Sequence, residues 1–134
     1  MLGWALVLPV LKSRLPLQQL VRLMAREGRA TARDTDTEHT IITLARVVHR
    51  AVGLGRRDNC LERSLIAYRY LSAVNANPLL VVGACAGDTG IEGHVWLTVD
   101  GEPIHETRDR VDRYARVTVF HADGCVGAVP RTSP

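Results

Sequence analysis

Residues 93–106 read GHVWLTVDGEPIHE, and this stretch determines the expected fold. Apolar and polar residues alternate along HVWLTV, which is typical of a β-strand with one buried face. The Asp100-Gly101 pair that follows is the strongest short-range signal for a tight hairpin turn. EPIHE then forms the return strand. The stretch therefore predicts two antiparallel strands joined by a hairpin.

Two more strands are expected around this hairpin. LLVVGACA, residues 79–86, is a short apolar run after Pro78 and predicts a buried strand. ARVTVF, residues 115–120, predicts the last strand, after a charged stretch at 107–114. The tail beyond it is rich in Gly and Pro and is expected to fray. Together these segments predict an antiparallel meander.

Helices are expected before the strands. Pro16 starts one helix, whose apolar stripe is formed by Leu17, Leu20, Val21 and Met24, and Gly28 ends it. The polar residues 29–37 predict a loop. A second helix, capped by Asp36 or Thr37 and closed by Gly53 and Gly55, has an apolar face made of Ile41, Leu44, Ala45, Val48 and Val52.

A further helix begins near Cys60, with Asp58 or Asn59 at its N-cap. The apolar stretch Leu2–Leu11 is favoured as a core helix, because it is shorter than the roughly 20 residues that cross a bilayer. It also lacks the features of a signal peptide. Helices followed by an antiparallel sheet predict an α+β fold in one domain.

Composition narrows the class of protein. The chain has 134 residues, a mass of 14.7 kDa and 46% apolar residues, which suits one domain with a real core. Aromatic residues make up 4% and the net charge is +3. Scattered arginines without a helix-turn-helix pattern argue against nucleic-acid binding. Three cysteines without a C-x-x-C pair predict a reducing compartment, so we expect a cytoplasmic protein without membrane contact.

Cys60, His94 and Glu106 form the candidate catalytic group. Cys60 lies at the start of a helix, where unpaired N–H groups stabilise a thiolate, the nucleophilic form. With the turn at Asp100-Gly101, residues 94 and 107 would pair directly, so His94 and Glu106 would be near neighbours; a one-residue bulge could bring them face to face. A cysteine at a helix start that faces a histidine and an acid on adjacent strands is the arrangement of an acyl-transfer enzyme with a cysteine nucleophile.

Each of these residues has competitors in the sequence. Cys85 lies in an apolar strand, where a thiol ionises with difficulty, and Cys125 lies in a Gly-rich loop. His49 belongs to a helix before the cysteine. His105 is expected on the sheet face opposite Glu106, so His94 ranks above both histidines as the base. Taken singly, each of these residue types is more often structural than catalytic.

Three segments, DNCLERSLIAYRYL, PLLVVGACAG and GHVWLTVDGEPIHE, resemble the transglutaminase-like cysteine peptidases of lasso-peptide biosynthesis. Specifically, the chain looks like the stand-alone peptidase half of the split B protein, and the likeness covers roughly residues 38–107. The resemblance implies a transglutaminase-like (papain-like) core over residues 38–127. Residues 1–37 would then be a helical segment that packs on this core or docks to a partner.

The resemblance also implies a function. Such enzymes remove the leader from a ribosomally made precursor peptide, after which a lasso cyclase closes the ring. It assigns Cys60 as nucleophile, His94 as general base and Glu106 as the acid that orients His94. Asp is commoner at the acid position in the family, so Asp100 and Asp109 remain alternatives. The oxyanion would be held by N–H groups at the start of the Cys60 helix, with Asn59 as a supporting donor.

The same resemblance sets the expected partners. No metal or cofactor is expected, and a separate leader-binding recognition protein would be needed, because 134 residues cannot hold both modules. Two other functions remain open. One is an acyltransferase or transglutaminase on the same fold, with an amine in place of water. The other is a non-catalytic scaffold for the cyclase complex.

Overall fold

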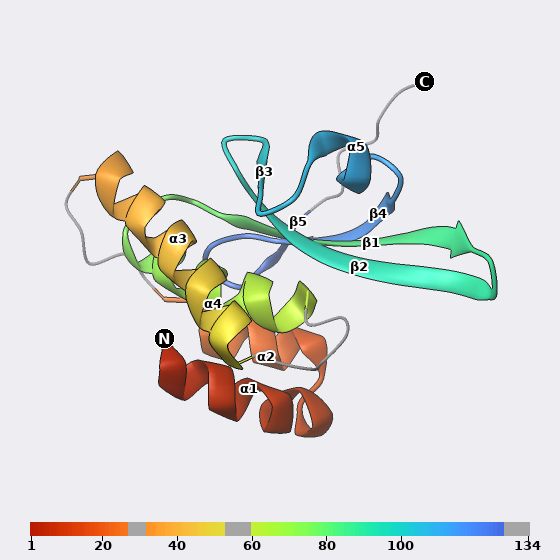
Figure 1. The fold of residues 1–134 in the computed structure, drawn as a ribbon, viewed down its shortest axis with the longest axis horizontal. Helices are drawn as coiled ribbons and strands as arrows, with labels where there is room; N and C mark the ends of the chain where they lie inside the picture. Colours follow the sequence, from red (N-terminus) through yellow and green to blue (C-terminus); the bar gives the residue numbers. More distant parts are fainter. Residues whose placement is uncertain (27–31, 53–59, 128–134) are drawn as a thin grey trace.

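A computed structural model describes residues 1–26, 32–52 and 60–127 (Figure 1). Four helices come first: α1 (Leu2–Arg14), α2 (Leu17–Met24), α3 (Thr35–Val52) and α4 (Cys60–Ala73). The strands follow, with one short helix among them: β1 (Leu79–Gly87), β2 (Gly90–Val99), β3 (Glu102–Ile104), α5 (Arg108–Val111), β4 (Ala115–Phe120) and β5 (Val126–Gly127). The α+β class expected from the sequence is confirmed.

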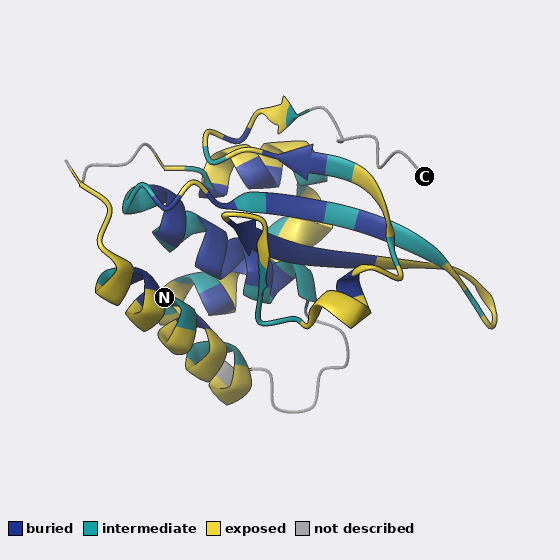
Figure 2. Ribbon diagram, turned by 90° about the horizontal axis from the view of Figure 1, so that it is seen from above, coloured by how far each residue is buried: buried dark blue, intermediate teal, exposed yellow. Residues whose placement is uncertain are grey.

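Helix α4 is the central helix. It contacts α1, α2 and α3 on one side and strands β1 and β2 on the other. Leu65, Ala67, Tyr68 and Leu71 are fully buried, and Figure 2 shows the buried positions of the helices turned toward the sheet. Residues 64–68 are all buried, and this run is longer than one helical turn, so α4 is covered on all sides at this level. The fold therefore holds α4 between the other helices and the sheet. Cys60 is the first residue of this helix.

The sheet is antiparallel, with the strand order β3-β2-β1-β4-β5. The hairpin predicted around Asp100-Gly101 is present, and Leu97 pairs with Ile104 in the expected register. The predicted meander is wrong for the last strands, because β4 pairs with β1 and not with β3. Strands β1 and β2 lie at the centre of the sheet. After β3, which lies beside β2, the chain passes through α5 to reach β4 on the other side, beside β1. The reason is packing, since Phe120 and Val119 of β4 complete the apolar layers on the two faces of β1.

Two apolar layers lie on opposite faces of the sheet. On the helical face, Leu80, Val95 and Leu97 join the main core with α1–α4. On the other face, a smaller cluster is formed by Val81, Trp96, Val111, Val119, Leu79 and Tyr114. Residues alternate between the faces along each strand, so Val95 belongs to the main core while Trp96 belongs to the small cluster. The short helix α5, which the sequence did not predict, contributes Val111 to that cluster.

Other expectations need correction. Asp34 caps α3, because its carboxylate accepts a hydrogen bond from the amide of Asp36 at 3.1 Å; Asp36 and Thr37 already belong to the helix. Leu44 is 47% exposed, so it does not belong to the buried face of α3. Helix α2 ends at Met24, before Gly28. Part of the tail is ordered as β5.

The stretch Leu2–Leu11 is a helix, as expected, but only one of its faces belongs to the core. Ala5 and Leu8 are buried, whereas Leu2, Leu6 and Val10 are between 59% and 66% exposed. These three residues follow one another at four-residue spacing and form one outer face of α1. Several other sequence expectations, among them those on Gly28, Gly53, Gly55, Asp58 and Asn59, fall outside the described residues.

Candidate active site

His94 and Glu106 meet at the edge of β2. Strand β3 pairs with β2 only from Leu97 to Val99, so no described strand covers this edge at His94. After Ile104 the chain leaves the sheet, because His105 adopts a left-handed conformation with φ of 64°. Glu106 is thereby turned inward, with 2% of its side chain exposed, and its Oε1 lies 3.2 Å from Nε2 of His94. The bulge expected between paired strands is replaced by this left-handed residue.

Three cationic or potentially cationic side chains surround the Glu106 carboxylate. Arg63 of α4 donates a hydrogen bond to Oε1, the oxygen that also faces His94. Nη1 of Arg110 in α5 lies 3.3 Å from Oε2. Such charge-assisted contacts fix the carboxylate in position. They also connect it to α4, the helix that begins at Cys60.

Two aromatic rings stack against the imidazole of His94. Its ring lies 5.0 Å from that of Tyr114 and 5.9 Å from that of Trp96, in stacked arrangements. The residue is 6% exposed, and this burial lowers the pKa of His94 below its ordinary value, against the opposing effect of Glu106. His94 is therefore neutral at pH 7, the form in which a histidine accepts a proton.

Cys60 enters the site through α4. It is half-buried and packs against the main core. One turn further along the helix, Oγ of Ser64 donates to the main-chain oxygen of Val95 at 3.2 Å, and Arg63 binds Glu106. Residues at i, i+3 and i+4 share one helix face, so Cys60 lies on the face of α4 that meets this edge of β2. Asn59 lies outside the described residues.

The structure thus brings some of the predicted residues together and leaves one apart. His94 and Glu106 are neighbours, whereas the described residues include no hydrogen bond between Cys60 and either of them. Cys60 packs with the helical layer, while His94 stacks on residues of the small cluster on the other face. Glu106 connects the two layers at the uncovered edge of β2, because its carboxylate contacts both His94 and Arg63 of α4.

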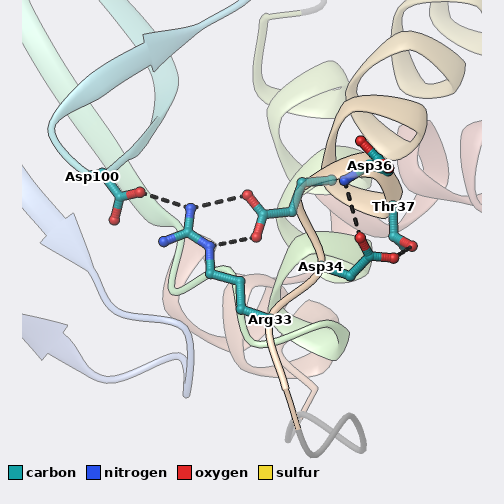
Figure 3. A network of polar contacts seen from close by, with 6 residues as sticks. Arg33, Asp34, Asp36, Thr37 and Asp100 are labelled. Carbon is teal, nitrogen blue, oxygen red and sulfur yellow. Dashed lines mark hydrogen bonds and ion pairs between the residues drawn. The ribbon is translucent and has the colours of Figure 1, made fainter.

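The alternative acids have other partners. Asp100 lies at the hairpin tip, 2.7 Å from Nη2 of Arg33, which also binds both oxygens of Glu38 (Figure 3). This hydrogen bond from Arg33 holds the pKa of Asp100 below its ordinary value. Asp109 is exposed on α5. Neither carboxylate contacts His94 among the interactions of the described residues.

The alternative bases and nucleophiles lie elsewhere. Nε2 of His105 is 2.7 Å from the main-chain oxygen of Ile42 in α3, so that ring serves to hold the loop. Cys85 is half-buried rather than enclosed, and it lines a cavity of about 320 Å³ together with Glu92, Arg113 and Tyr114. Cys125 is exposed in the turn before β5. His49 lies on α3.

Sequence reasoning missed Arg63, Arg110, Trp96 and Tyr114. Arg63 could have been found, because it follows Cys60 by three residues and therefore shares its helix face. Trp96 could also have been found, since it lies two residues after His94 on the same strand face. Tyr114 and Arg110 gave no such signal, because their positions depend on α5 and on the crossover to β4.

Two further observations concern the described part of the chain. It contains no cluster of three His, Cys, Asp or Glu side chains suited to a metal ion. None of its helices combines the length and apolar character that crossing a bilayer requires.

Comparison with known proteins adds one positive finding. Residues 3–119 match the transglutaminase-like superfamily, a stretch that runs from α1 to β4. No curated protein and no solved structure matches the chain. The superfamily match includes the two N-terminal helices, Cys60, His94 and Glu106.

Proposed function

Because this chain belongs to the transglutaminase-like superfamily, whose members include cysteine peptidases and acyltransferases, we propose that it is a cysteine peptidase. Its substrate is the leader–core junction of a lasso-peptide precursor. The superfamily supports the chemistry. The likeness of residues 58–71 and 93–106 to lasso leader peptidases supports the substrate.

One observation carries the catalytic part of the proposal. The buried Glu106 carboxylate contacts His94 and, through Arg63, the helix that begins at Cys60. An acid that orients a neutral histidine near a helix-start cysteine is the arrangement that activates a thiol. The distance between Nε2 of His94 and Oε1 of Glu106 is 3.2 Å, within the range of an ion pair.

In the proposed reaction, Sγ of Cys60 attacks the carbonyl carbon of the scissile peptide bond while His94 takes the thiol proton. Main-chain N–H groups at the start of the helix, with Asn59 as a supporting donor, stabilise the oxyanion. His94 gives its proton to the leaving amine, and the C–N bond breaks to leave a thioester on Cys60. Water, deprotonated by His94, then hydrolyses the thioester and restores the thiol.

The test compares single cysteine variants. The wild-type protein, Cys60→Ala and Cys85→Ala are each incubated with precursor and recognition protein, and the products are weighed by mass spectrometry. We expect leader removal by the wild type and by Cys85→Ala, and none by Cys60→Ala with an unchanged circular dichroism spectrum. Cleavage by Cys60→Ala would remove the nucleophile assignment. A small primary amine in the reaction separates hydrolysis from acyl transfer, because transfer leaves the amine on the product.

Partners belong to the same proposal. A separate recognition protein would tether the leader. Tethering brings the effective concentration of the scissile bond into the mM range, so a weak encounter gains about 10²–10⁴-fold in avidity. The exposed face of α1, formed by Leu2, Leu6 and Val10, supports docking of a protein at this end of the molecule. Efficient cleavage of full-length precursor without the recognition protein would contradict this dependence. The lasso cyclase would act next, on the freed core peptide.

A further inference from the structure

A second cavity lies beside the candidate acid. Its volume is about 500 Å³, and it opens between α3, the chain that follows β3, and α5. The residues that line it are Arg46, Pro103, His105, Glu106, Thr107 and Arg110. A cavity of this size can hold one amino-acid side chain with its solvent. The reaction proposed above does not use it.

The charge around this cavity is unbalanced. Arg46 projects from α3 and forms no ion pair with any described residue, while Arg110 contributes a guanidinium from α5. The one carboxylate present is that of Glu106, and it is already shared among Arg63, Arg110 and His94. Among the described residues that line the cavity, two arginines therefore face one carboxylate that is already shared, and the lining carries an excess of positive charge.

The remaining polar groups of the cavity do not supply that anion. Nε2 of His105 faces the carbonyl of Ile42, which fixes this nitrogen as the donor in the neutral ring. Burial, aided by Arg46 and Arg63, lowers the pKa of His105. The hydroxyl of Thr107 makes no capping bond to α5 and remains available to a ligand.

We infer that this cavity is a substrate subsite that binds the carboxylate side chain of an Asp or Glu residue in the peptide. Arg46 would pair with the carboxylate, and the Thr107 hydroxyl would donate to it. The inference rests on the proposed function, since it names a feature of that peptide substrate. A guanidinium next to an uncommitted hydroxyl suits a carboxylate better than an amide or an apolar group.

The position of the cavity relates the acidic residue to the scissile bond. Glu106 separates the cavity from His94, with contacts of 3.2 Å to His94 and 3.3 Å to Arg110. An extended peptide advances about 3.3–3.6 Å per residue, so the acidic side chain would lie within roughly three residues of the scissile bond. The subsite therefore selects sequence close to the cleavage point, on the peptide itself.

The test uses small probes that need no catalysis. N-acetyl-glutamate methylamide, N-acetyl-glutamine methylamide and inorganic phosphate are titrated into the ¹⁵N-labelled full chain, and amide signals of Thr107 and Arg110 are followed by NMR. We expect saturable shifts with the glutamate probe and weaker binding of the glutamine probe and of phosphate. Arg46→Gln should weaken glutamate binding by about three- to tenfold. Arg50→Gln, which removes the same charge one turn further along α3 outside the cavity, should not.

Equal affinity for the glutamate and glutamine probes would overturn the inference, as would an unchanged affinity in Arg46→Gln or an equal loss in Arg50→Gln. Phosphate binding as tight as that of the glutamate probe would make the cavity a general anion site and would also overturn it. Cleavage is measured separately. If the wild type fails to cleave precursor while glutamate binding still depends on Arg46, the proposed function fails and the carboxylate site stands.

Discussion

Replacing Glu106 with glutamine should damage both stability and catalysis, because one carboxylate serves three neighbours. The side chain is 2% exposed, and it binds Arg63, whose side chain is 21% exposed. Breaking a fully buried ion pair from one side costs about 3–5 kcal/mol. Arg110 is 53% exposed and can turn to water, so its share of the loss is small. We therefore expect the free energy of unfolding to fall by about 2–4 kcal/mol.

That loss is large enough to measure by thermal denaturation. For a chain of this length, 1 kcal/mol corresponds to roughly 3–4 °C, so Tm should fall by about 6–16 °C. Turnover of precursor should fall by about 10²–10⁴-fold below the new Tm, since the amide cannot stabilise the imidazolium that forms on His94. The carboxylate also raises the pKa of His94, so the acidic limb of the pH–rate profile should move to lower pH in the variant.

Glu102→Gln is the matched control. It makes the same chemical change at an ion pair with Arg108 in which the two side chains are 66% and 60% exposed. Exposed pairs contribute little to stability, so this variant should melt and cleave like the wild type. If Glu106→Gln keeps the wild-type Tm and turnover, or if both variants lose the same amount, Glu106 is not the acid that orients His94.

Three further predictions concern burial and packing in the sheet and in α4. Gly83→Ala should destabilise the fold by about 1–3 kcal/mol in urea denaturation, because its Cβ would lie 2.8 Å from ring atoms of Trp96 and 2.9 Å from Cβ of Tyr114. Burial raises the pKa of Tyr68 to about 12, so absorbance titration should show one tyrosine ionising late, and Tyr68→Phe should remove that late step. Burial holds the pKa of His94 below 6.5, so the unfolded chain takes up the proton first and the free energy of unfolding should fall as pH drops below about 6.5; His94→Gln should flatten that part of the pH dependence.

Local signals in the sequence accounted for the hairpin and for the helix that begins at Cys60. The Asp100-Gly101 turn sets the hairpin and its register. The expectation of one buried face for residues 94–99 is wrong, because all six residues are buried and both faces of the sheet are covered. Strand order is a different matter. That β4 lies beside β1 depends on Val119 and Phe120 filling gaps on the two faces of the sheet, and no local pattern encodes it.

The N-cap of α3 is a second feature that the local sequence does not determine. Asp34, Asp36 and Thr37 are all good capping residues, so the sequence offers several equivalent starts. In the structure Asp34 is the cap, since its carboxylate accepts hydrogen bonds from the amide of Asp36 and the hydroxyl of Thr37, and Arg33 beside it binds Glu38 in the first turn. Starting the helix at Thr35 keeps Glu38 within reach of Arg33.

The contact between His94 and Glu106 depends both on the register of the hairpin, which is local, and on tertiary contacts. The register that pairs Leu97 with Ile104 would, if continued, place Glu106 opposite Val95, whose side chain lies on the helical face away from His94. A regular strand could therefore not join the two residues. The left-handed conformation of His105 ends the strand and turns Glu106 toward His94. Histidine is among the residues that adopt this conformation more readily. What holds it is the contact of its ring with Ile42 on α3, so the site's acid is positioned by tertiary structure that the strand sequence alone does not contain.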